Sequence, residues 1–318
     1  MEQNMLNRWL RLRAGGGRFR RPVSFALVMA SMLTLVLVTA CADRDGPAVP
    51  GDGQQVVLIT GSTSGLGREV AYRMADAGAH VIVHGRDAER GEAVVRKINE
   101  DSPGSARFYR ADFAGLDAVE ALATAILRDY ERLDVLVNNA GIGGPEERTE
   151  SDDGYELTFQ VNYLSHFLLT HRLLGLLEHS APARIVNVAS AAQTPIDFDD
   201  PGIEQDYDSW RAYGQSKLAQ ITFSKTLAGH LADSGVTTYS LHPATFMDTR
   251  MVRQAGIDPR ATVDEGAEAV MRLMTGDDVE HGGYYDGLER DQAHAQAYDE
   301  QAREKLWQLS REYVGLED

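Results

Sequence analysis

The sequence contains almost no cysteine and no zinc-site pattern, and each absence excludes a class of protein. Cys41 is the only cysteine in 318 residues, so an internal disulfide and a zinc cluster built from cysteines are excluded. The nine histidines include no pair spaced with a glutamate as a zinc hydrolase requires. We therefore expect neither a disulfide scaffold nor a metal site.

Basic charge is scarce outside the N-terminus. The formal net charge is −17, and residues 1–40 carry +5 of their own, which leaves −22 on the remainder. A body this acidic repels nucleic acid, and no basic patch interrupts it. The hydrophobic content of 43% is enough for a sizeable core, which excludes an intrinsically disordered chain.

The N-terminal segment resembles an export signal. Six arginines precede an uncharged run from Val23 to Ala40, and small residues lead up to Cys41. The four residues ending at Cys41 resemble the lipobox of bacterial lipoproteins, and Arg20-Arg21 resembles a twin-arginine signal. We expect a signal peptide or membrane anchor, with lipidation at Cys41 and a membrane-associated protein. Two alternatives stay open. The apolar run could be retained as a membrane helix, or the start of the sequence could be set too far upstream, so that the cell makes a cytoplasmic protein without this segment.

From residue 54 onward, apolar runs alternate with segments of helical periodicity. Strands are predicted at Val56–Ile59, His80–His84, Ala106–Arg110, Val135–Val137, Arg184–Val188 and Val236–Leu241, with helices at Arg68–Gly78, Asp87–Asn99, Leu116–Tyr130 and Ser209–Leu231. This alternation predicts right-handed crossovers and an open parallel sheet whose ligand lies at the carboxyl ends of the strands. We therefore expect residues 1–41 as signal or anchor, 42–53 as a flexible linker, and 54–318 as one α/β domain with a doubly wound, Rossmann-type sheet.

The pattern after Met251 is less informative. We predict a helix at Val263–Met274, a final edge strand at Gly282–Asp286, and a polar terminal helix at Asp291–Tyr313. Trp307 is expected to be a packing residue of that last helix.

A glycine-rich turn follows the first strand and indicates nucleotide binding. Thr60 to Gly67 joins a buried strand to a helix, a context in which glycines let the backbone approach a pyrophosphate and the helix N-terminus favours its charge. The cofactor-binding candidates in this turn are Gly61, Ser62, Ser64, Gly65, Leu66 and Gly67.

The end of the second strand indicates which dinucleotide binds. Gly85 stands where NAD-binding proteins usually carry an acidic residue, and Arg86 follows it. A guanidinium pairs bidentately with a 2′-phosphate, so NADP is favoured over NAD. Asp112, after the third strand, can accept a hydrogen bond from the adenine amino group. The alternatives are that Arg86 only begins a turn and that Asp112 only caps the next helix.

Tyr213 and Lys217 form a candidate proton-transfer pair. They lie four residues apart in a segment of helical periodicity, so both side chains share one face of the predicted helix. A free phenol titrates near pH ~10, and a neighbouring ammonium favours the phenolate. The pair is thus typical of a tyrosine acid tuned by a lysine. The alternative is an amphipathic helix with a surface lysine.

Taken together, these motifs resemble the classical short-chain dehydrogenase/reductase family. Thr60 to Gly67, Asn138 to Gly141, and Tyr213 with Lys217 occur in the family's order over about residues 54–290. The resemblance implies that one sheet serves both cofactor and substrate. It also implies that Asn139, Ala140 and Gly141 line the adenosine side, that Tyr213 acts on the substrate, and that both Tyr213 and Lys217 contact the cofactor.

The same resemblance assigns further site residues. Asn162 matches the active-site Asn that holds a relay water, and Ser190 matches the catalytic Ser after its strand. Ala244 stands where the family usually has glycine after Pro243, so Pro243 is expected near the nicotinamide. Either Thr245 or Thr249 is expected to contact the carboxamide, with Thr249 placed more like the family's residue.

The 22 residues between Ser190 and Tyr213 form an insert similar to that of the retinol dehydrogenase-like branch. That branch handles lipophilic alcohols and carbonyls. The resemblance implies an NADP-dependent enzyme that interconverts an alcohol and a ketone or aldehyde, acts on a small-molecule substrate and forms a homo-oligomer. A non-catalytic NADP-binding sensor and an epimerase or dehydratase of the wider superfamily remain as alternatives.

Overall fold

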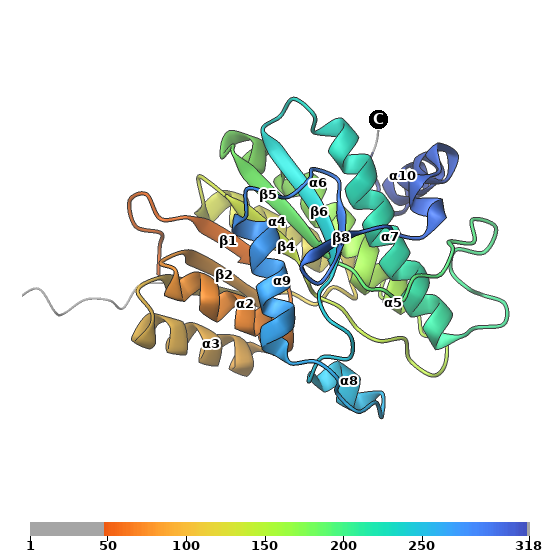
Figure 1. Ribbon diagram of the computed structural model, residues 1–318, viewed down its shortest axis with the longest axis horizontal. Helices are drawn as coiled ribbons and strands as arrows, with labels where there is room; N and C mark the ends of the chain where they lie inside the picture. Colours follow the sequence, from red (N-terminus) through yellow and green to blue (C-terminus); the bar gives the residue numbers. More distant parts are fainter. Residues whose placement is uncertain (1–47, 317–318) are drawn as a thin grey trace, which may run out of the picture. The chain divides into compact units, whose positions relative to one another are not determined.

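A computed structural model describes residues 48–316 of the chain (Figure 1). The signal or anchor predicted for residues 1–41 lies outside the described residues, as does the first half of the predicted linker, residues 42–47. Between residues 48 and 316, none of the helices has both the length and the apolar character needed to cross a membrane.

Eight strands form one sheet in the order β3-β2-β1-β4-β5-β6-β7-β8. Their bounds are β1 Val56–Ile59, β2 His80–Gly85, β3 Ser105–Arg110, β4 Val135–Asn138, β5 Ala183–Val188, β6 Val236–His242, β7 Tyr284–Asp286 and β8 Glu289–Asp291. All neighbours pair in parallel except β7 with β8, which is an antiparallel edge pair. Every residue of β1 and β4 is buried, as expected for the centre of a parallel sheet covered on both faces.

Helices cover both faces of this sheet. The crossover helices are α2 Gly65–Asp76, α3 Ala88–Asp101, α4 Leu116–Asp129, α6 Ser165–His179, α7 Ser209–His230 and α9 Val263–Thr275. The apolar sides of α2, α3 and α9 form one core with the sheet, and those of α4, α6 and α7 form the other (Figure 1). The chain thus folds as the expected doubly wound, Rossmann-like α/β domain.

Three shorter helices complete the elements that matter for the site. They are α5 Leu157–Phe159, which continues as a π-helical turn η1 Gln160–Leu164 into α6, and α8 Arg250–Gln254 after β6. The chain ends in a 3-10 turn η2 Ala295–Tyr298 and α10 Glu300–Tyr313.

Two C-terminal predictions were wrong. The strand predicted around Gly282–Asp286 exists as β7, but it is not the edge, because β8 pairs beyond it. The terminal helix does not run from Asp291; it begins at Glu300, because the Asp299 side chain accepts hydrogen bonds from two backbone N–H groups and caps it there. The packing role of Trp307 is confirmed, since its ring contacts Phe167 and stacks on His230.

The crossover point of the sheet lies between β1 and β4, from which the chain winds outward in both directions. The glycine-rich turn follows β1 and the Asn138 to Gly141 segment follows β4, so both lie at the same carboxyl edge. Ligands of open α/β sheets bind in the crevice at such an edge.

Candidate active site

The glycine-rich turn packs backbone against backbone on the end of β4. Gly61 has φ +64°, and a Cβ added there would lie 2.8 Å from Cα of Ala140. A Cβ on Gly67 would lie 2.7 Å from the carbonyl oxygen of Gly61. Only glycine fits these two positions, and the resulting cradle at the start of α2 suits a pyrophosphate.

Thr60 and Asn139 hold that cradle in place. The Thr60 hydroxyl accepts hydrogen bonds from the backbone N–H groups of Asn139 at 2.8 Å and Ala140 at 2.9 Å. In return, Nδ2 of Asn139 donates to the Thr60 carbonyl at 2.7 Å. The structure therefore gives Asn139 a positioning role, because its amide holds the turn.

The other members of the turn differ in what they offer a ligand. The buried Ser62 hydroxyl donates to Ile59 and accepts from the N–H of His84, so it fixes the turn. Leu66 is a core residue of α2. Ser64 is the N-cap of α2, and its side chain makes no capping hydrogen bond. Of the turn's two serines, Ser62 is therefore held by the protein, and Ser64 is the one whose hydroxyl could face a ligand.

Two arginines meet at the end of β2. Gly85 and Arg110 are partners in the β2–β3 register, and Nε of Arg110 donates to the carbonyl of Arg86 at 3.0 Å. The side chains of Arg86, Arg110 and Asp112 line an open cavity of about 560 Å³. Asp112 forms an ion pair with Arg86 at 3.7 Å. Asp112 also accepts from the Ala114 N–H, so it caps the following turn as well.

Sequence reasoning missed Arg110. It is exposed at a strand end two residues before Asp112. This place in the sequence, at the end of the predicted third strand, could have indicated a second phosphate-binding arginine. Two exposed guanidiniums at one strand edge match the charge of a 2′-phosphate. The glycine cradle and this arginine pair together fit NADP.

Ser190, Tyr213 and Lys217 meet at the carboxyl end of β5. Ser190 follows this strand, is 8% exposed and accepts from the Ala192 N–H at 3.1 Å, so its own proton is available to donate. Tyr213 is half-buried on α7. Burial raises the pKa of Tyr213, and a hydrogen bond with Ser190 partly lowers it.

Lys217 lies beneath Tyr213, with Nζ 5.6 Å from the centre of the phenol ring. It is 4% exposed and donates to the carbonyl of Val188 at 3.0 Å. Burial lowers the pKa of Lys217 to about 7. Burial therefore shifts the pKa values of the two side chains in opposite directions. Only the pKa of Lys217 moves toward neutral pH.

Asn162 lies in the π-helical turn η1. Its Oδ1 accepts from the Ile142 N–H at 2.8 Å, and its Nδ2 donates to the Ile142 carbonyl and the Ser216 hydroxyl. This side chain ties the segment after β4 to α7. A Cβ on Gly141 would lie 3.2 Å from Oδ1 of Asn162 and 3.7 Å from Nζ of Lys217, so glycine keeps that space open.

His166, one turn after Asn162, was not anticipated from the sequence. Its Nδ1 lies 2.8 Å from the Asn162 carbonyl, and its Nε2 lies 2.9 Å from the Thr60 hydroxyl. Burial lowers the pKa of His166 to about 3, so the ring is neutral. This histidine joins the glycine-rich turn to the helix that carries Asn162.

The structure separates the two threonine candidates after β6. Thr245 lies 2.9 Å from Nε2 of His242, whereas Thr249 caps α8. A Cβ on Gly65 would lie 3.4 Å from Cγ2 of Thr249, so Thr249 sits beside the glycine-rich turn. Pro243 is buried at the end of β6.

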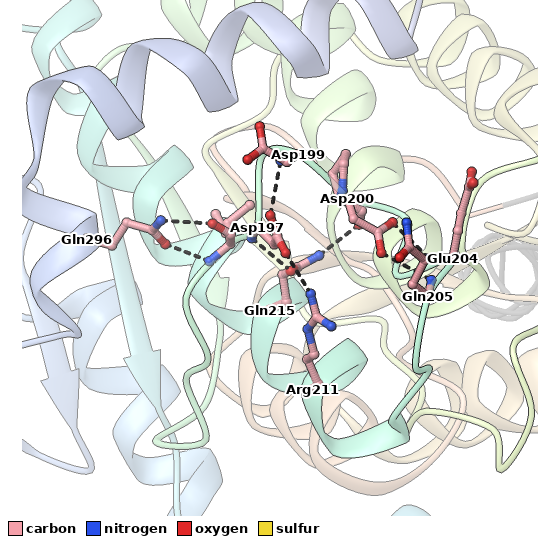
Figure 2. A network of polar contacts seen from close by, with 10 residues as sticks. Asp197, Asp199, Asp200, Glu204, Gln205, Arg211, Gln215 and Gln296 are labelled. Atoms are coloured by element: carbon pink, nitrogen blue, oxygen red, sulfur yellow. Dashed lines mark hydrogen bonds and ion pairs between the residues drawn. The ribbon is translucent and has the colours of Figure 1, made fainter.

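The insert before Tyr213 is held by side-chain contacts from α7 and η2 (Figure 2). Both amide atoms of Gln296 bond to the backbone of Ile196, at 2.6 and 2.9 Å. Arg211 pairs with Asp197 at 3.0 Å, and Gln215 donates to the Pro201 carbonyl at 2.8 Å. These contacts fix the segment that follows Ser190 against α7 and the C-terminal region.

Comparison with known proteins places the chain in a family. The family model described as short chain dehydrogenase matches residues 55–259. Mouse retinol dehydrogenase 13 is 34% identical over 94% of this chain and 95% of its own length, and human retinol dehydrogenase 14 is 38% identical over 82% and 87%.

Solved structures agree with this. An uncharacterised protein from Mycobacterium paratuberculosis is 29% identical with a TM-score of 0.70, covering 84% of this chain and 96% of its own. A short chain dehydrogenase from Escherichia coli CFT073, solved with NADPH, is 27% identical with a TM-score of 0.62 over 74% and 97%. This chain therefore belongs to the short-chain dehydrogenase/reductase family of NAD(P)-dependent oxidoreductases that act on alcohols.

Proposed function

We propose that this protein is an NADP-dependent oxidoreductase that interconverts an alcohol with an aldehyde or ketone, using Tyr213 as the acid and base. The observation that carries the proposal is the cluster of Ser190, Tyr213 and Lys217 at the carboxyl end of β5. It lies on the same sheet edge as the glycine cradle.

NADP, when bound, supplies or accepts the hydride. In reduction, the Tyr213 hydroxyl donates its proton to the carbonyl oxygen of the substrate, and Ser190 donates a hydrogen bond to that oxygen as charge develops. In oxidation, Tyr213 takes the proton back.

Lys217 adjusts the acidity of Tyr213. Its ammonium favours the phenolate and thereby opposes the rise in pKa that burial gives Tyr213. The Nζ group has three N–H bonds and donates two of them to protein acceptors, Val188 and Gln220, which leaves one for a cofactor hydroxyl. Asn162 holds the Ile142 segment beside this lysine and completes the site.

The cofactor preference rests on Arg86 and Arg110. Both are exposed at the end of β2 and β3, where a 2′-phosphate needs positive charge. Gly61, Ser64, Gly65 and Gly67 would hold the pyrophosphate. Asp112 would contact the adenine. Thr249, rather than Thr245, would contact the nicotinamide side of the cofactor, because Thr249 lies beside Gly65.

The substrate class is taken from the relatives. Several are retinol dehydrogenases by name, and they match over most of their length. We propose a lipophilic primary alcohol or its aldehyde as the substrate of this chain.

The N-terminal segment supports membrane attachment in addition. The arginines, the apolar run and Cys41 resemble a lipoprotein signal. Cell fractionation with identification of the N-terminal peptide tests this. A lipidated Cys41 in the membrane fraction supports it, and intact residues 1–40 on a soluble protein contradict it.

Oxidation of NADPH in the presence of an aldehyde panel tests the function. We expect stoichiometric NADPH oxidation with at least one apolar aldehyde, and slower oxidation of NADH. A sensor, an epimerase or a dehydratase consumes no cofactor in net turnover, so binding of NADPH without oxidation by any aldehyde would contradict the proposal.

A further inference from the structure

Gln220 is a buried polar residue next to the proposed proton-transfer centre, and the mechanism above assigns it no step. It lies one turn after Lys217 on α7 and is 1% exposed. Its Oε1 accepts a hydrogen bond from Nζ of Lys217 at 2.8 Å. The carbonyl of Val188, at 3.0 Å, is the other acceptor of this ammonium.

The other end of the Gln220 amide shows what orients it. Its Nε2 is buried and has no hydrogen-bond partner among the described residues. A buried amide normally satisfies both of its ends. Within the described part of the chain, the contact with Lys217 is thus the only side-chain hydrogen bond that fixes which way this amide points.

Few charged groups face Lys217. Two histidine rings interact with it, His166 from α6 and His242 from the end of β6. Burial lowers the pKa of each, so both rings are neutral near neutral pH. Tyr213 faces it from its own helix. No carboxylate pairs with Lys217 within residues 48–316. Neutral dipoles are therefore what surrounds the ammonium.

We propose that Gln220 is a positioning residue whose amide oxygen holds Lys217 protonated and in place without cancelling the positive charge that acts on Tyr213. A neutral acceptor favours the ammonium over the amine. A carboxylate would do so more strongly, but its negative charge would offset the field at the phenol. The inference rests on the proposed function of Tyr213 and Lys217.

Titration of Lys217 tests this without a substrate. The NMR signal of the Lys217 side chain, identified in isotope-labelled protein by its absence from Lys217→Met, is recorded against pH with NADP⁺ present. In Gln220→Leu, Lys217 loses an acceptor, so we expect it to deprotonate about one pH unit lower. In Gln220→Glu, the carboxylate favours the ammonium more strongly, and we expect Lys217 to deprotonate at higher pH.

Gln215→Leu is the matched control. Gln215 is also 1% exposed on α7, but its amide bonds to Pro201 and Asp197 instead of the lysine. We expect the Lys217 titration of this variant to match the wild type. If Gln220→Leu fails to fold, Gln220→Glu carries the test.

The outcomes separate the two proposals. An unchanged Lys217 titration in the folded Gln220 variants, or an equal shift in Gln215→Leu, overturns the role of Gln220 and leaves the proposed function standing. A wild type that never oxidises NADPH with an aldehyde overturns the function itself. Where a substrate is found, the pH profile of alcohol oxidation should change in the Gln220 variants and not in Gln215→Leu.

Discussion

Nε2 of His166 lies 2.9 Å from the Thr60 hydroxyl, and Nδ1 of the same ring lies 2.8 Å from the Asn162 carbonyl. A carbonyl only accepts, so Nδ1 carries the ring proton and Nε2 accepts from Thr60. One neutral ring thus connects the residue that holds the cofactor cradle with the turn that carries Asn162.

We expect His166→Phe to break both contacts and to lower kcat about tenfold, with a stability loss of about 2–3 kcal/mol from the unpaired Thr60 and Asn162 groups. His171→Phe is the control, because His171 makes the same contact with the carbonyl four residues earlier, at 2.7 Å, and lies outside the site. Steady-state kinetics and urea unfolding measure the two effects. Equal kcat values in both variants would refute a special role for His166.

Arg86→Ala and Arg110→Ala should each weaken NADP⁺ binding about tenfold or more and change NAD⁺ binding little, since each guanidinium is expected to meet only the 2′-phosphate. Arg90→Ala is the control, because Arg90 pairs with Asp87 one turn into α3. Calorimetric titration with both dinucleotides gives the ratio of the Kd values for NADP⁺ and NAD⁺ in each variant. An equal loss for NAD⁺ and NADP⁺ would rule out phosphate recognition by these residues.

Gly67→Ala should abolish tight cofactor binding and destabilise the fold, because its Cβ would press on the Gly61 carbonyl at 2.7 Å. Gly175→Ala is the opposite case. A Cβ at Gly175 in α6 meets nothing within 4 Å, so we expect a gain of about 0.5–1 kcal/mol. Thermal melts and NADPH fluorescence measure both, and normal cofactor binding by Gly67→Ala would contradict the cradle.

Much of this arrangement is predictable because its signals are local. The strands buried on both faces appear as continuous apolar runs such as Val56–Ile59, and the glycine-rich turn is contiguous in sequence. The expected helices and strands up to α9 are present within a few residues of their predicted ends.

The remainder depends on contacts that a pattern does not contain. The strand β8 is Glu289-Arg290-Asp291, three exposed polar residues, so no apolar alternation marks it. His166 and Gln220 look like ordinary residues of amphipathic helices. Their roles arise only when the packing of α6 and α7 brings them to Thr60 and Lys217.

The buried histidines predict acid sensitivity. Burial lowers the pKa values of His80, His84 and His171 to about 4 and that of His166 to about 3. The unfolded chain binds these protons near pH ~6.5, whereas the folded chain does not. Stability is therefore full above that pH and falls as the pH decreases toward the folded values.

The sensitivity is measured by urea unfolding between about pH 7 and pH 5. We expect His80→Gln, which can still face Ser105 and Tyr130, to reduce the slope of unfolding free energy against pH by up to about 1.4 kcal/mol per unit. Identical slopes in variant and wild type would show that His80 takes up its proton in the folded state.

The single-turnover rate of NADPH oxidation by Tyr213→Phe tests most directly whether Tyr213 is the proton donor. With an aldehyde that the wild type reduces, we expect about a thousandfold slower reaction, with NADPH binding and thermal stability close to those of the wild type. Tyr298→Phe, at an exposed tyrosine of η2, should react at the wild-type rate. A Tyr213→Phe variant that retains full activity would contradict the assignment of Tyr213 as the proton donor.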